Sequence, residues 1–110
     1  MNKSAVLCGL ILLVLLVSGI LVGCVPVVWH AKQAYELNNQ GRHDEAIVEC
    51  NKAIELYPYY AWAFYTRACT YKLQGKKAEA IADFEKFITL SDNPQWVEKA
   101  REAIEELSKC

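Results

Sequence analysis

The sequence repeats itself with a period of 34 residues, and this period constrains the fold more than any other feature. Nine positions are identical when residues 27–60 are compared with residues 61–94, namely Ala34/Ala68, Gln40/Gln74, Gly41/Gly75, Glu45/Glu79, Ala46/Ala80, Ile47/Ile81, Lys52/Lys86, Ile54/Ile88 and Leu56/Leu90. Charge is kept at two further pairs, Arg42/Lys76 and Glu49/Asp83. A period of this length is typical of a helix–turn–helix unit that stacks on its neighbours to bury an apolar face.

Each unit divides into two halves, in which apolar residues recur at helical spacing. Gly41 and Gly75 fall at the breaks between the halves, where a residue in the left-handed conformation commonly ends a helix. Ala46 and Ala80 follow in the second halves, and their small side chains predict a close approach of the two helices of each unit. The sequence therefore predicts two antiparallel helix pairs.

A fifth helix is predicted after the second unit. Asp92 or Asn93 is suited to cap its first turn, and Pro94 suits the first helical position. The apolar residues of this segment form one stripe, opposite a charged face, and are Trp96, Ala100, Ala103, Ile104 and Leu107. Such a helix is typical of the solvating cap at the end of a repeat stack.

The repeat resembles the tetratricopeptide repeat. The matching residues are Ala34, Leu37, Gly41, Ala46, Cys50, Ala53 and Pro58 in the first unit, and Phe64, Ala68, Tyr71, Gly75, Ala80 and Phe84 in the second. The resemblance implies an all-α domain over residues 29–108, with repeat 1 at 27–60, repeat 2 at 61–94 and a capping helix at 94–108. Four residues depart from the family pattern, namely His30, Gln33, Phe87 and Asp92, so the match is poorest in the first helix.

The N-terminal segment is apolar, and two interpretations of residues 1–23 are open. No Asp, Glu, Lys or Arg occurs from Ser4 to Ala31, and an apolar run extends from Ala5 to Val22 after Lys3. A secretory signal peptide has a positive head, an apolar middle of about 7–15 residues and a small-residue end. A membrane-spanning helix needs about 20 apolar residues. In both interpretations residues 24–28 form a short tether to the folded domain.

The end of the apolar run, Leu21-Val22-Gly23-Cys24, resembles the lipobox of bacterial lipoproteins. The resemblance implies cleavage before Cys24 and lipidation of its sulfur. Acyl chains contribute about 0.8 kcal/mol per buried CH₂, so two or three of them anchor a chain stably. The resemblance also implies the extracytoplasmic face of a bacterial envelope. The alternative is a single-pass N-terminal membrane anchor, for which Lys3 favours an inside N-terminus.

Residues 57–65 hold six aromatic side chains, namely Tyr57, Tyr59, Tyr60, Trp62, Phe64 and Tyr65. Phe64 and Tyr65 are ordinary for the tetratricopeptide repeat, so the other four are the excess. Three interpretations are open. Aromatic residues pack cores and interfaces through their buried area, they are favoured in binding hot spots, and Trp and Tyr favour the headgroup level of a membrane.

The resemblance also implies a concave face lined by the first helix of each unit. The groove-facing residues would be Ala31, Tyr35, Asn38 and Asn39 in the first unit, and Trp62, Tyr65, Cys69 and Lys72 in the second. We expect this face to bind a protein or peptide. Some relatives clamp a C-terminal carboxylate with a Lys/Asn/Arg set, but Ala31, Tyr35 and Thr66 occupy those places here, so clamping of a chain terminus is not expected.

Charge and motif content argue against other classes of protein. The formal net charge of −1 provides no basic field for nucleic acid. The sequence has no phosphate-binding loop and no zinc-ligand spacing, so neither a cofactor, a metal site nor an enzymatic activity is expected. The acidic residues are expected to lie on solvated helix faces and to pair with lysines. A Cys50–Cys69 disulfide is conceivable in an oxidising compartment, but the spacing does not indicate it.

Together these features predict a membrane-anchored protein-interaction module, acting as an accessory or assembly factor of a cell-envelope complex. Two alternatives are open. Three repeats are usually needed for stability, so a short stack is also consistent with a structural subunit that self-associates. A small-ligand carrier would use Tyr35, Trp62, Tyr65 and Cys69 on the concave face.

Overall fold

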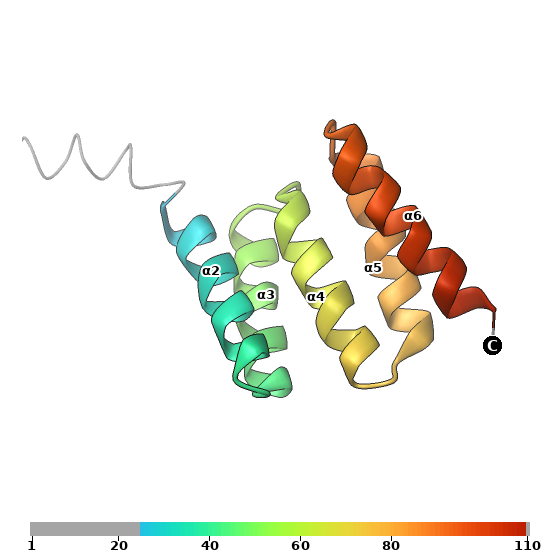
Figure 1. The fold of residues 1–110 in the computed structure, drawn as a ribbon. Helices are drawn as coiled ribbons and strands as arrows, with labels where there is room; N and C mark the ends of the chain where they lie inside the picture. The colour runs from blue at the N-terminus through green and yellow to red at the C-terminus, as the bar shows by residue number, and fades with distance from the viewer. Residues whose placement is uncertain (1–24, 110) are drawn as a thin grey trace, which may run out of the picture.

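The computed structural model describes residues 25–109, which form five α-helices joined by short connections (Figure 1). Their bounds are Val25–Asn39 for α2, His43–Leu56 for α3, Ala61–Leu73 for α4, Lys77–Leu90 for α5 and Pro94–Ser108 for α6. All regular structure in these residues is α-helical, which confirms the predicted all-α fold. None of the described helices is long and apolar enough to cross a membrane. The predicted signal peptide or anchor at residues 1–23 and the predicted lipidation site at Cys24 lie outside the described residues.

The helices form two antiparallel pairs and a cap (Figure 1). α2 packs on α3, α4 packs on α5, and the pairs meet where α4 contacts α3 and α2, while α6 packs on α5. The start of α2 and the α3–α4 and α5–α6 connections lie at one end of the stack, and the α2–α3 and α4–α5 turns lie at the other. We call these the proximal end (residues 25–30, 56–62 and 90–96) and the distal end (residues 38–44 and 73–77).

The two distal turns close in the same way. Gly41 and Gly75 both have a φ of 76°, in the left-handed region that glycine adopts without strain. The backbone N–H of Arg42 donates to the carbonyl of Leu37 at 2.9 Å, and the N–H of Lys76 donates to the carbonyl of Tyr71 at 2.9 Å. These bonds satisfy carbonyl groups that the helix ends leave free. The helix-ending role predicted for the two glycines is therefore confirmed.

The predicted start of the last helix is also confirmed. Asn93 caps α6, because its Oδ1 accepts the backbone N–H groups of Gln95 at 3.1 Å and Trp96 at 3.3 Å. Pro94 occupies the first turn, where the missing N–H costs nothing. Of the two candidates for the cap, the structure uses Asn93 and not Asp92.

Two clusters of buried side chains hold the helices together. The larger cluster lies among α4, α5 and α6 and consists of Phe64, Ala68, Ala80, Phe84, Phe87 and Ala100. The smaller cluster lies among α2, α3 and α4 and consists of Val27, Ala53 and Ala63. Burial of apolar area contributes about 25 cal/mol per Å², so the cluster with three phenylalanines stabilises its helices more than the cluster of small residues does.

In each helix pair, an acidic residue of the second helix is bonded to a basic side chain of the first. Asp83 accepts two hydrogen bonds from Arg67, at 2.7 Å from Nε and 2.8 Å from Nη2. Glu49 accepts a bond from His30, whose Nδ1 lies 2.5 Å from Oε2. These contacts explain why an acidic residue is kept at Glu49/Asp83. They also explain why His30 departs from the tetratricopeptide-repeat pattern. The expected pairing with lysine in solvent is wrong for Asp83, which is 6% exposed.

We expect acid to loosen the contact between α2 and α3. Burial raises the pKa of Glu49, but the hydrogen bonds from His30 and Lys52 lower it, and the net pKa lies below its ordinary value of 4.5. A carboxyl group with a lowered pKa contributes stability above its ordinary pKa and loses it as the pH falls through the lowered value. In Glu49→Gln the unfolding free energy should therefore change less with pH in this range. Urea unfolding over a pH series measures the difference.

Circular dichroism at neutral pH is the control for this experiment, because it shows that Glu49→Gln keeps its helices. An identical pH dependence in the parent and in Glu49→Gln would contradict the expected role of this carboxyl group.

Candidate protein-binding face

The predicted groove residues lie on two helices that share one face of the stack. Figure 1 shows α2, α4 and α6 side by side at the front, with α3 and α5 behind them, and we call the surface of these three helices the front face. α2 contributes Ala31, Tyr35, Asn38 and Asn39, and α4 contributes Trp62, Tyr65, Cys69 and Lys72. Each of these residues is therefore on a first helix, and α6 takes the third place along the face.

Trp62 belongs to an aromatic cluster that joins α4 to α5 and α6. The centroid of its ring lies 4.8 Å from that of Trp96, 5.6 Å from that of Tyr65 and 5.6 Å from that of Phe87. The ring of Tyr65 lies 5.5 Å from Phe84, 5.0 Å from Phe87 and 5.5 Å from Trp96, again mostly edge to face. Pairs in this geometry contribute about 0.5–1.5 kcal/mol beyond their buried area. Trp62 and Tyr65 are thus held by a rigid support.

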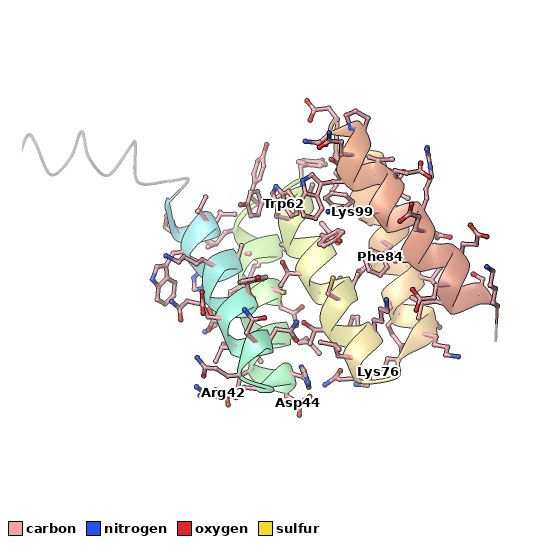
Figure 2. The ribbon with its side chains drawn as sticks, in the orientation of Figure 1. Arg42, Asp44, Trp62, Lys76, Phe84 and Lys99 are labelled. Carbon is pink, nitrogen blue, oxygen red and sulfur yellow. The ribbon has the colours of Figure 1, made fainter. Side chains whose placement is uncertain are left out.

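One edge of this cluster is open to solvent. The Trp62 side chain is 38% exposed although it contacts Trp96 and Phe87. Figure 2 shows Trp62 near the proximal end of α4, with Lys99 beside it and Phe84 further down the stack. Nζ of Lys99 lies 4.3 Å from the centre of the Trp96 ring, a cation–π contact. The exposed aromatic edge therefore has a positive charge next to it.

Of the eight predicted residues, four are exposed, three are partly covered and Ala31 is buried. Tyr35, Asn39, Trp62 and Lys72 are exposed, and Nζ of Lys72 lies 3.4 Å from a carboxylate oxygen of Glu106 on α6. The three covered residues are Asn38, which is bonded to His43 at 2.8 Å, and Tyr65 and Cys69, which pack against the larger buried cluster. A partner on this face would meet mainly the four exposed side chains.

The excess aromatic residues of the 57–65 stretch divide between two roles. Packing explains Trp62 and also Tyr60, which contacts the smaller buried cluster. It does not explain Tyr57 and Tyr59, which are 51% and 66% exposed and whose ring centroids lie 6.1 Å apart. These two tyrosines lie in the α3–α4 connection at the proximal end and are not among the predicted groove positions.

The two cysteines of the described helices are free thiols and are poor nucleophiles. Burial, followed by smaller effects of neighbouring charges, raises the pKa of Cys50 to about 12. Burial also raises the pKa of Cys69. The thiolate is the reactive form, so neither side chain is activated for covalent chemistry. Within residues 25–109, no three His, Cys, Asp or Glu side chains are grouped to hold a metal ion.

Two parts of this region were not singled out as functional from the sequence. Trp96 and Lys99 were assigned only to the stripe and the charged face of a capping helix, yet Trp96 completes the aromatic cluster around Trp62. Arg67 was not identified at all, although it ties three helices together through Asp83 on α5 and Asn51 on α3. Two signals in the sequence could have indicated these roles. Trp96 is unusually large within its apolar stripe, and an acidic residue is kept at Glu49/Asp83.

Comparison with known families agrees with the repeat period and with the geometry of the helix pairs. Family models described as tetratricopeptide repeat match residues 30–60 and residues 49–82. A search of curated proteins gave no significant match. Together the matches extend from α2 to the first part of α5, and they support a tetratricopeptide-repeat protein. Repeats of this family generally act as non-enzymatic scaffolds that bind protein partners.

Proposed function

We propose that this protein is a membrane-anchored module that binds a protein or peptide partner on its front face, as an accessory or assembly factor of a cell-envelope complex. The observation that carries the proposal is the exposed edge of Trp62, 38% accessible on top of an aromatic cluster that fixes its position. Trp and Tyr are enriched in binding hot spots, and a side chain that is already ordered loses little entropy on binding.

The chemistry of the face suggests what the partner presents. The exposed edge of Trp62 and the ring of Tyr35 favour an apolar or aromatic side chain. Lys99 favours a nearby carboxylate, whereas Lys72 already has Glu106 as its partner. Asn39 offers hydrogen bonds to a peptide backbone. The partner segment proposed here is therefore apolar with acidic flanks.

Support for the membrane attachment comes from the sequence. The apolar run from Ala5 to Val22 ends in the sequence Leu21-Val22-Gly23-Cys24, which resembles a lipobox, and α2, the first described helix, begins at Val25. Either a lipidated Cys24 or an uncleaved helix would hold the domain at a membrane surface. A tether raises the effective concentration of the module near partners in the same membrane.

Photo-crosslinking in the native envelope tests this function. A photoreactive phenylalanine analogue at Tyr35, which is 58% exposed on α2, should form an adduct with a distinct protein. Adding Trp62→Ala should weaken binding by about 2 kcal/mol, roughly thirty-fold in affinity, and should remove most of the adduct. Mass spectrometry of the adduct measures both results and identifies the partner.

The matched control carries the analogue at Val48, which is 51% exposed on α3, a helix that lies behind the front face. Equal adducts from Tyr35 and Val48 would contradict binding at the front face. An adduct with a second copy of the chain would instead favour the self-associating subunit. Circular dichroism of Trp62→Ala separates a loss of contact from a loss of fold.

A further inference from the structure

Exposed large apolar side chains gather at one end of the stack. Nine such side chains occur in the described residues, and six of them lie at the proximal end, namely Val28, Trp29, Leu56, Tyr57, Tyr59 and Trp62. The other three are Tyr35, Val48 and Leu73. Isolated exposed apolar residues are ordinary on protein surfaces, but a concentration at one end marks a contact with a protein or a membrane.

The distal end has the opposite character. Its two turns contain Gln40–Asp44, with the sequence Gln-Gly-Arg-His-Asp, and Gln74–Lys77, with the sequence Gln-Gly-Lys-Lys. Figure 2 shows Arg42, Asp44 and Lys76 together at this end of the molecule. The helices between the ends have 13–15 residues, so the two ends are about 20 Å apart at 1.5 Å per residue. The domain is therefore apolar at one end and charged at the other.

The chain enters the domain at its apolar end. α2 begins at Val25, three residues after the apolar run that ends at Val22. An extended residue spans at most about 3.5 Å, so Gly23, Cys24 and Val25 place the start of α2 within about 10 Å of the end of that run. With the membrane attachment proposed above, on which this step rests, the proximal end is the part of the domain nearest to the lipid.

We propose that the proximal end rests on the lipid bilayer, with Tyr57, Tyr59 and Trp29 at the headgroup level. Trp and Tyr have an apolar body and a polar edge, which suits the boundary between headgroups and acyl chains. The membrane tether keeps the proximal end close to the bilayer, so each aromatic side chain needs only a low affinity for lipid.

The charges near this end define the kind of membrane contact. Residues 25–30, 56–62 and 90–96 contain no Lys or Arg, Asp92 is their one acidic residue, and Lys99 is a single cation beside them, so these described residues form no cation cluster to bind anionic lipid. The contact is therefore apolar and aromatic, and zwitterionic phosphatidylcholine is sufficient for it. In this orientation the helix axes stand away from the membrane, and the front face stays open at the side for a partner.

Paramagnetic broadening of amide signals tests the proposal. The full isotope-labelled chain is incorporated into phosphatidylcholine nanodiscs in which some lipids carry a nitroxide on the headgroup. We expect loss of the amide signals of residues 56–62, while the signals of the distal turns, residues 40–43 and 74–77, are retained. In Tyr57→Ser/Tyr59→Ser, whose changed side chains are exposed, the signals of residues 56–62 should return.

Leu73→Ser provides the matched control, because Leu73 is 63% exposed but lies at the distal end. This variant should lose the same signals as the parent. Retained signals at residues 56–62 in a parent chain that co-elutes with nanodiscs would overturn the inference and leave the proposed anchoring intact. Broadening of the distal turns, or broadening that persists in the double tyrosine variant, would also overturn it. A chain that does not co-elute with nanodiscs would overturn the anchoring and this inference together.

Discussion

Asp83→Ala is expected to lower the free energy of unfolding by about 3 kcal/mol, at the lower end of the range for a broken buried ion pair. The Asp83 carboxylate is 6% exposed and accepts two short hydrogen bonds from Arg67. Its removal leaves a guanidinium group, with only 21% of the side chain exposed, facing no carboxylate. Urea unfolding followed by both circular dichroism and tryptophan fluorescence measures the loss.

The control for this prediction is Glu106→Ala, which breaks the exposed contact of Glu106 with Lys72 at 3.4 Å. Exposed pairs contribute less than about 1 kcal/mol, so this variant should stay close to the parent. If Asp83→Ala were no less stable than Glu106→Ala, the Arg67–Asp83 pair would not be holding α4 to α5.

Phe84→Ala is expected to cost about 3–5 kcal/mol, which is typical when a buried phenylalanine is removed and its cavity stays partly open. Phe84 is 1% exposed in the larger cluster, where its ring lies 5.5 Å from that of Tyr65. Small domains have a total stability of about 5–15 kcal/mol, so this one change removes a large part of it. The same urea unfolding experiment measures the effect.

Cys50→Ala is the matched control, because Cys50 takes the place of Phe84 in the first repeat and is also fully buried. It removes a single sulfur atom, so the cavity and the loss of stability should both be much smaller than for Phe84→Ala. Equal losses of unfolding free energy in the two variants would show that the phenylalanine cluster stabilises the domain no more than the core of the first helix pair does.

The fold was predictable because its signals are local and occur twice. The left-handed conformation of Gly41 and Gly75 depends on the glycine itself, and the small side chains of Ala46 and Ala80 are buried in both pairs. The 34-residue period placed these signals in register, and the Asn93 cap is contained within three residues of α6. Each of these features can be predicted from neighbouring residues in the sequence, without knowing which distant residues are in contact.

Contacts between helices were harder to predict. The side chains of Arg67, Asp83 and Asn51 come from three helices, and their meeting depends on how the helices cross. The same reason explains why the family resemblance assigned Trp62 to an open groove, whereas one of the three aromatic rings around it, Trp96, belongs to the capping helix. Residue spacing assigns a face to each side chain, but only packing decides how much of that face a neighbouring helix covers.

The unequal size of the two buried clusters has a mechanical consequence. The buried side chains of the first helix pair are all small, namely Val27, Ala31, Ala34, Ala46, Cys50 and Ala53, whereas α4, α5 and α6 share three phenylalanines. In a chain fastened through its N-terminus and pulled by a bound partner, tension reaches α2 before it reaches the phenylalanine cluster. The weaker pair would then extend first and absorb the load, while the helices that carry Trp62 and Trp96 keep their shape.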